Sequence, residues 1–364
     1  MAKRNGDAFF DVLRSAPHHY RPEEVAKLFE SVSEDRVKTL AGVLATYITT
    51  NLPEAIDRRD GLADYRTNPY VLLTSASVMN LDEPARFAAF LFNTKLYMGL
   101  ETSFGKSIEA AFVAPYPLNP DAKHKWIDAP EKIAEFAKLK GLAREEKAQV
   151  RSGSVWREVD KSCVVGTRRY MASIKSGPNC INDSQVQAMT SAIIQHHKQW
   201  MADTKKTYPE VTGLDIVVGL TYGTDRTTNN KENQILAKLL AAGFEEEDRA
   251  KRPGVLIDTA TRSIRVYRRV GKEFWAFIGN PVEPSGTGFV FLEIMLALSK
   301  ALSSGMEAAD LETRINNKLK GLTAALSKLT FPSKSLPAWV REDFNENDLF
   351  WFATAITAFY DEGI

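Results

Sequence analysis

The sequence predicts an α/β protein in which helices flank a mixed β-sheet, with further helical segments at both ends of the chain. Trp156 to Ile174 has the pattern of an antiparallel hairpin, because polar and apolar residues roughly alternate on both sides of a glycine-containing turn. Residues 214–221 form a nearly continuous apolar run, which is typical of a strand inside a sheet. Apolar residues at helical spacing dominate residues 7–57 and the chain after Gly288.

The elements before the hairpin are expected to be helices joined by loops. Residues 7–57 show helical periodicity, and Pro22 suits a first helical turn because its ring fixes a helix-compatible φ. A second helix is predicted over Glu83 to Gly99, where the apolar residues recur on one side. Pro115 to Pro120 is expected to be a loop, and Pro130 to Leu139 a helix.

A long helix should follow the hairpin. Asn182 is a suitable N-cap and Gln185 completes a capping box, so the helix should run to about Lys205. Another helix is expected after the apolar strand, and Val255 to Gly279 should contain two or three short strands that end in an alternating aromatic segment. The remaining helices are predicted at Lys231 to Ala242, Phe289 to Leu302, Ala308 to Leu329 and Asp348 to Tyr360.

Composition indicates an ordinary globular protein. The 364 residues are 44% hydrophobic and 26% charged, which favours one large domain with embellishments, or two domains. The expected regions are an N-terminal helical region at 1–100, a core at 101–300 and a C-terminal helical region at 301–364. No run is expected to span a membrane and no signal peptide is evident, so a cytoplasmic, prokaryotic location is predicted. Cys163 and Cys180 are too few for a disulfide scaffold or a zinc site.

Charge is balanced overall but uneven along the chain. The formal net charge is +1, and basic residues gather at Arg168-Arg169 and at Arg262 to Lys272, whereas acidic residues gather at Glu245 to Asp248. A protein with one basic cleft and acidic surfaces elsewhere would fit this pattern and could bind nucleic acid. Any single charged run is more often a solvated face.

The hairpin carries the residues with the clearest chemical potential. Because side chains on a strand alternate in facing, Glu158, Asp160 and Ser162 share one face, as do Ser173 and Lys175 on the partner strand. Pairing of the strands can therefore bring Asp160 beside Lys175, whose strand ends directly before a Ser-Gly-Pro-Asn loop. The simpler interpretation of such a pair is a cross-strand ion pair.

Asp160 followed by Ser173-Ile174-Lys175 resembles the motif of the PD-(D/E)XK nuclease superfamily, especially its type II restriction endonucleases. Two positions depart from that motif. Val159 stands where proline usually precedes the first acid, and Ser173 replaces the second acid. The resemblance implies a PD-(D/E)XK nuclease core over roughly residues 101–300, with the missing carboxylate supplied from elsewhere, as in restriction enzymes of this kind that carry serine there.

Three acidic residues could replace the missing carboxylate. Glu158 shares the strand face of Asp160, and Asp183 opens the following helix. Glu109 closes the segment Gly105 to Glu109, which is similar to the helix that precedes the catalytic strands in the superfamily and often supplies a metal ligand. We favour Glu109, with Asp183 as the weaker choice.

Phosphodiester hydrolysis explains why these residue types belong together. A hard cation such as Mg²⁺ neutralises the developing negative charge and holds a water in line, and it prefers oxygen ligands. The resemblance implies that Asp160, the carbonyl of Ile174 and Glu109 bind Mg²⁺, and that Lys175 orients or helps deprotonate the water. Ser173 occupies the remaining position of the catalytic motif.

The function implied is sequence-specific cleavage of double-stranded DNA by an Mg²⁺-dependent type II restriction endonuclease. A palindromic target suits a homodimer, and a cognate DNA methyltransferase is expected in the same system. One alternative is another nuclease of this superfamily in DNA repair or processing. A different class is a catalytically silent DNA-binding or assembly protein, which the serine at position 173 makes credible.

Residues for DNA recognition are expected in the loops after two strands. The loop from Tyr222 to Asn230 is rich in side chains that can hydrogen-bond to base edges, because Arg and Asn match guanine and adenine edges in the major groove. A solvent-exposed loop without that role is the alternative. The residues assigned to DNA binding are Asn179, Asn182, Arg226, Asn229 and Asn230.

Overall fold

The protein is described here by a computed structural model. The residues that it describes are 22–59, 61–65, 68–113, 125–175, 181–223, 231–248, 250, 252, 254–308, 310–329 and 336–360. The chain divides into two compact units, of which unit 1 comprises residues 1–43 and 105–299 and unit 2 comprises residues 44–104 and 300–364. The predicted core region 101–300 therefore falls largely in unit 1.

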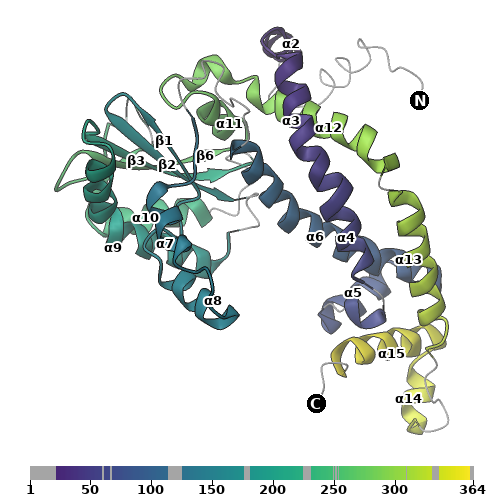
Figure 1. The fold of residues 1–364 in the computed structure, drawn as a ribbon. Helices are drawn as coiled ribbons and strands as arrows, with labels where there is room; N and C mark the ends of the chain where they lie inside the picture. The colour runs from purple at the N-terminus through teal and green to yellow at the C-terminus, as the bar shows by residue number, and fades with distance from the viewer. Residues whose placement is uncertain are drawn as a thin grey trace. The chain divides into compact units, whose positions relative to one another are not determined.

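Unit 1 contains a six-stranded mixed sheet with the strand order β1-β2-β3-β6-β5-β4, and helices flank it (Figure 1). This confirms the predicted α/β class. The strands β2, β3 and β6 are mutually parallel, whereas the pairs β1–β2, β4–β5 and β5–β6 are antiparallel. The strands are β1 (Lys161–Val165), β2 (Arg168–Lys175), β3 (Gly213–Leu220), β4 (Phe244–Glu246), β5 (Leu256–Asp258) and β6 (Ile264–Val270).

The predicted hairpin is present as β1 and β2, which pair antiparallel with Lys161 opposite Ala172. Gly166 has a φ of 56°, a left-handed conformation that glycine adopts at no steric cost, and it forms the turn. The first strand begins at Lys161 and not at Trp156 as expected. Trp156 and Val159 are both buried against the helical layer, and the turns that place them there interrupt the strand.

Two crossover helices connect the parallel strands, as parallel pairing requires. Helix α9 (Asp183–Thr207) joins β2 to β3, and α10 (Lys231–Ala241) follows β3. The predicted capping box is confirmed, because the Asn182 side chain accepts a hydrogen bond from the Gln185 amide at 2.9 Å and the Gln185 side chain accepts one from the Asn182 amide.

The main core lies between one face of the sheet and the helices α9 and α10 (Figure 1). The opposite face carries α11 (Lys272–Gly279), and the Phe277 ring makes edge contacts with the rings of Trp126, Tyr170 and Tyr267. The core on the helical side comprises, among others, Met171, Ile193, Trp200, Leu214, Ile216, Ile235, Leu239 and Val266.

The prediction of a strand over the aromatic segment before Gly279 is wrong, because residues 272–279 form the helix α11. Every residue from Phe274 to Gly279 is buried, so apolar residues surround this short helix on all sides and mimic the pattern of a buried strand. The short helix α8 (Arg144–Gly153) and strand β4 were also not predicted.

The remaining helices of unit 1 lie before and after the sheet. They are α2 (Pro22–Glu30), α3 (Glu34–Thr46), the last part of α6 (Pro84–Val113), α7 (Pro130–Ala137), the 3₁₀ turn η4 (Pro284–Thr287) and the first part of α12 (Val290–Ala308). The single helix α6 extends well past the predicted end at Gly99 and includes Glu109.

Unit 2 is helical among its described residues. Its core packs Leu72, Phe87, Phe92, Leu322 and Trp351 together. Its elements are the π-turn η1 (Tyr47–Asn51), α4 (Leu52–Asp57), the 3₁₀ turn η2 (Leu62–Tyr65), α5 (Pro69–Val78), α13 (Leu311–Leu326), α14 (Ala338–Asp343) and α15 (Glu346–Tyr360), with the adjoining parts of α3, α6 and α12.

One stretch contradicts the expectation that no run reaches the length of a membrane span. Pro284–Ser303 has 20 residues and a mean hydropathy of 1.4, which is long and apolar enough by length and composition alone. Buried helices of soluble proteins meet the same two conditions, so the stretch does not decide whether this protein contacts a membrane.

Candidate functional site

Asp160 is held directly before β1 by three contacts. Its amide donates to the carbonyl of Ala172 at 2.9 Å, which ties the residue to β2 directly before the first strand begins. Its Oδ2 accepts a hydrogen bond from the Ile174 amide at 2.7 Å, and its Oδ1 lies 3.6 Å from the Nζ atom of Lys132. The carboxylate is thus fixed between the hairpin and α7, and both of its oxygens face a donor.

Lys175 ends β2 at the carboxyl edge of the sheet and is partly exposed. The register of β1 and β2 ends at the pair of Lys161 and Ala172, and Glu158 lies in the turns before β1. The Nζ atom of Lys175 is 3.7 Å from Oε2 of Glu158. The hairpin therefore brings acids and the lysine together, but the ion partner of Lys175 is Glu158 and not Asp160.

Ser173 offers no carboxylate at the position of the second acid. The side chain is 3% exposed, and within the described part of the chain its hydroxyl has no hydrogen-bond partner. A replacement acid therefore has to come from another element.

Glu109, on the last part of α6, comes close to the hairpin. Burial raises the pKa of its carboxyl above the ordinary value, and the charge of Asp160 raises it further, while Lys161, Lys132 and Lys175 oppose the shift. Such mutual effects require proximity. Asp160, directly before β1, and Lys175, at the end of β2, are thus near enough to Glu109 on α6 for their charges to affect its pKa.

Asp183 and Asn182 occupy the start of α9 and are engaged there. The Asp183 side chain is 86% exposed and forms an ion pair with Lys231, which lowers the pKa of its carboxyl through a hydrogen bond and charge. Asn182 caps the helix. Neither has a contact with Asp160 or Glu109 among the described residues. The assignments of Asn179, Arg226, Asn229 and Asn230 to DNA binding lie outside the described residues.

A divalent cation fits the chemistry of this cluster. Two half-buried carboxylates repel each other when both are charged, and a cation between them would reverse that cost. Within the described ranges no group of three or more His, Cys, Asp or Glu side chains is placed to hold a metal. Two carboxylates and the carbonyl of Ile174 are nevertheless enough for Mg²⁺, which usually keeps several waters and takes only one or two protein carboxylates.

Two lysines near the acids were not predicted from the sequence. Lys132 projects from α7 and contacts Asp160, and Lys161 in β1 is almost fully buried and pairs with Asp128. Both are close enough to Glu109 to lower the pKa of its carboxyl. Neither belongs to a recognisable motif. A lysine on a short amphipathic helix normally indicates a solvated face, so sequence reasoning could not find Lys132.

The expected basic cleft is not supported at Arg169 or at the start of β6. Arg169 is 0% exposed and donates two hydrogen bonds of 2.8 Å to the carboxylate of Glu131, so it cannot contact a phosphate. The acidic segment at Glu245 to Asp248 was expected to lie apart from the basic segment at Arg262 to Lys272. The two lie in the same part of the sheet instead, because β4, β5 and β6 pair in succession. Their ion pairs are Arg262–Glu245, Arg265–Glu247 and Arg252–Glu247.

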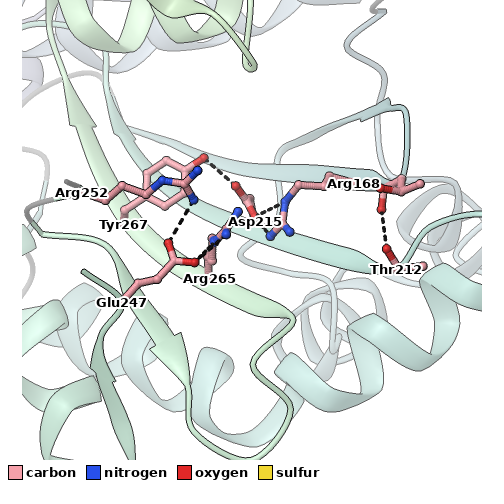
Figure 2. Close-up of polar contacts among 8 residues, drawn as sticks. Arg168, Thr212, Asp215, Glu247, Arg252, Arg265 and Tyr267 are labelled. Atoms are coloured by element: carbon pink, nitrogen blue, oxygen red, sulfur yellow. Dashed lines mark hydrogen bonds and ion pairs between the residues drawn. The ribbon is translucent and has the colours of Figure 1, made fainter. Parts of the chain in front are cut away.

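A second polar cluster on the α11 face of the sheet was also not predicted (Figure 2). Buried Asp215 accepts hydrogen bonds from the guanidinium of Arg168, one of them at 3.0 Å, and from the hydroxyl of Tyr267 at 3.1 Å. Burial and the neighbouring Asp215 charge raise the pKa of the Tyr267 hydroxyl well above its ordinary value. Among the described residues, each charged side chain of this cluster has a partner of opposite charge, so the charges compensate one another within the sheet.

No protein-family model matches the sequence, and a search of curated proteins finds no relative. The class that the fold defines is an α/β protein with a six-stranded mixed sheet flanked by helices.

Proposed function

We propose that this protein is an Mg²⁺-dependent nuclease of the PD-(D/E)XK type that cleaves double-stranded DNA. One observation supports it most: the charges of Asp160, directly before β1, and of Lys175, at the end of β2, both affect the pKa of Glu109 on α6, although 66 positions separate Glu109 from Lys175 in the sequence. The upstream helix, the hairpin and the long downstream helix also follow one another in the order that the resemblance implies.

The residues divide the work of hydrolysis among them. Mg²⁺ bound by Asp160, Glu109 and the Ile174 carbonyl would neutralise charge on the phosphate and lower the pKa of a bound water. Lys175, at the end of β2, would orient that water and stabilise the developing charge as an ammonium donor. Its ion pair with Glu158 holds the ammonium at this strand end. The Ile174 amide fixes the Asp160 carboxylate through the hydrogen bond to Oδ2.

The finer proposal is a type II restriction endonuclease that acts as a homodimer on a palindromic site, with a cognate DNA methyltransferase in the same cell. A nuclease of repair or processing is the alternative, and Ser173 favours a third candidate, a silent DNA-binding protein. The three differ in what they do to plasmid DNA.

Incubating the protein with supercoiled plasmid and Mg²⁺ tests the proposal. Discrete fragments that disappear with EDTA are expected for a restriction enzyme. Smears or structure-dependent cuts would favour repair or processing, and binding without cleavage would favour the silent protein. Asp160→Asn serves as the control that must remove cleavage, and cleavage at the wild-type rate by that variant would contradict the site assignment.

Metal affinity should depend on pH through Glu109. Its folded-state pKa is raised, so the stability that it contributes to the metal-free protein is present below its ordinary pKa of 4.5 and is lost as pH rises through the raised value. In the same pH window the Glu109 carboxyl loses its proton and can bind a cation. As pH increases, Mn²⁺ should therefore bind more tightly, and the number of protons released per bound Mn²⁺ should fall below one. Calorimetric titration with Mn²⁺ between about pH 5 and pH 7.5 measures both effects.

Glu109→Gln supplies the comparison for this pH dependence. The variant should bind Mn²⁺ more weakly at every pH, with a flatter pH profile, and its metal-free form should be more stable than the wild type at neutral pH. Glu145→Gln, at an exposed position of α8, should leave the profile unchanged. An unchanged profile in Glu109→Gln would remove Glu109 from the site.

A further inference from the structure

Lys132 lies beside the acidic part of the candidate site and has no assigned role. It belongs to α7, and its Nζ atom is 3.6 Å from Oδ1 of Asp160. The same ammonium donates hydrogen bonds to the carbonyl of Val159 at 2.7 Å and to the carbonyl of Arg157 at 3.4 Å. It therefore holds both the carboxylate and the chain segment that leads into it.

The position of Lys132 is protected from solvent. Its side chain is 18% exposed, and its ammonium also lies 5.8 Å from the centre of the Phe136 ring, within reach of a cation–π contact. A partly desolvated ammonium needs the carbonyl and carboxylate acceptors that surround it. These contacts come from one helix and one loop, so the lysine is part of the local packing and not a surface charge.

Lys132 acts on both acids at once. It contacts Asp160 directly, and its charge is among those that lower the pKa of Glu109, against the opposite effects of burial and Asp160. Without a metal, the two acids would otherwise face each other with their charges less compensated. The ammonium thus stands where positive charge is needed on the Oδ1 side of Asp160.

We infer that Lys132 is a positioning residue that serves as a resident counter-cation for Asp160 and Glu109, and that a divalent cation competes with its charge. The inference rests on the proposed metal site. It implies that the lysine stabilises the metal-free protein and weakens metal affinity, so that occupancy depends on the cation concentration. A lysine with only a packing role would instead support metal binding by keeping Asp160 in place.

Calorimetric titration of the full-length protein with Mn²⁺ separates these two roles. Lys132→Gln removes the charge but keeps a donor that can reach the carbonyl of Val159, and Lys132→Arg keeps the charge. We expect Lys132→Gln to bind Mn²⁺ about tenfold more tightly, since one unit charge close to the ligands is lost in a partly hydrated site. Lys132→Arg should stay within about twofold of the wild type. Lys138→Met, at the exposed end of the same helix, is the matched control and should bind as the wild type does.

Thermal unfolding with and without Mn²⁺ gives the second readout. In EDTA the melting temperature of Lys132→Gln should fall below that of the wild type, and saturating Mn²⁺ should restore most of the loss. Equal or weaker Mn²⁺ binding by Lys132→Gln would overturn the inference, as would a wild-type protein that binds no Mn²⁺. The plasmid assay tests the proposed nuclease activity separately. If Lys132→Gln binds Mn²⁺ more tightly but the wild type cuts no DNA, the nuclease proposal fails and the counter-cation role of Lys132 stands.

Discussion

Lys175→Met should reduce DNA cleavage by roughly 10²–10⁴-fold while leaving the fold intact, because the change removes a group that handles a proton or a developing charge in the transition state. Lys175 lies at the end of β2, is partly exposed and, within the described ranges, forms an ion pair with Glu158. Methionine keeps the length of the aliphatic chain, so the packing of the strand end should change little. The rate constant for single-turnover cleavage at saturating enzyme measures the effect without a contribution from binding.

Two comparisons make this result specific. Lys198→Met, at an exposed position of α9, removes the same charge from a helix surface outside the candidate site and should cleave at the wild-type rate. Asp160→Asn should lose about as much activity as Lys175→Met, and the double variant should lose little more, since groups that act together in one step are not additive. A Lys175→Met protein that cleaves as fast as the wild type would assign Lys175 to the ion pair with Glu158 alone.

The fold was predictable where local sequence determines local structure. The alternation on both sides of Gly166 predicted the hairpin, and Asn182 with Gln185 predicted the start of α9, because turn and cap chemistry depend on neighbouring residues only. The helix α11 was missed for the opposite reason. All residues from Phe274 to Gly279 are buried, and burial on every side leaves no periodic pattern that distinguishes a helix from a strand.

The candidate site was predictable only in the part that a motif contains. Asp160, Lys175 and Glu109 were named from spacing and resemblance, and in the structure the charges of Asp160 and Lys175 affect the pKa of Glu109. Lys132 joins them from α7 through a tertiary contact, for which the sequence carries no periodic or motif signal. The ion partner of Lys175, Glu158, lies in the turns before β1, which the expected longer strand did not include.

The largest effect on stability should come from the pair of Arg169 and Glu131, which anchors the other end of β2. Arg169 is fully buried between the rings of Trp156 and Tyr208, and its two hydrogen bonds to Glu131 provide the countercharge. Burial alone would raise the pKa of the Glu131 carboxyl, but the hydrogen bond and charge of Arg169 lower it below the ordinary value. The carboxylate is therefore charged at neutral pH, and its removal leaves a buried guanidinium without a counter-ion.

Glu131→Gln should lower the free energy of unfolding by about 3–5 kcal/mol, the usual cost of removing one partner of a buried ion pair. Urea titration followed by tryptophan fluorescence measures it, and Glu145→Gln, exposed on α8, should change stability by less than about 0.5 kcal/mol. Because the folded-state pKa of Glu131 is lowered, the stabilisation is present above the ordinary pKa of 4.5 and is lost as pH falls through the folded-state value. The difference between Glu131→Gln and the wild type should shrink accordingly in acid.

The double variant Arg169→Met with Glu131→Leu tests whether this buried site requires its two charges or only side chains of similar size. Replacing both partners removes the desolvation cost of the two charges, so the double variant should be considerably more stable than Glu131→Gln. Thr204 and Ser162 also accept hydrogen bonds from Arg169, and their hydroxyls would lose that partner, so full recovery is not expected. A double variant as unstable as Glu131→Gln would mean that the buried polar network, and not compensation of one charge, holds this end of the strand that carries Lys175.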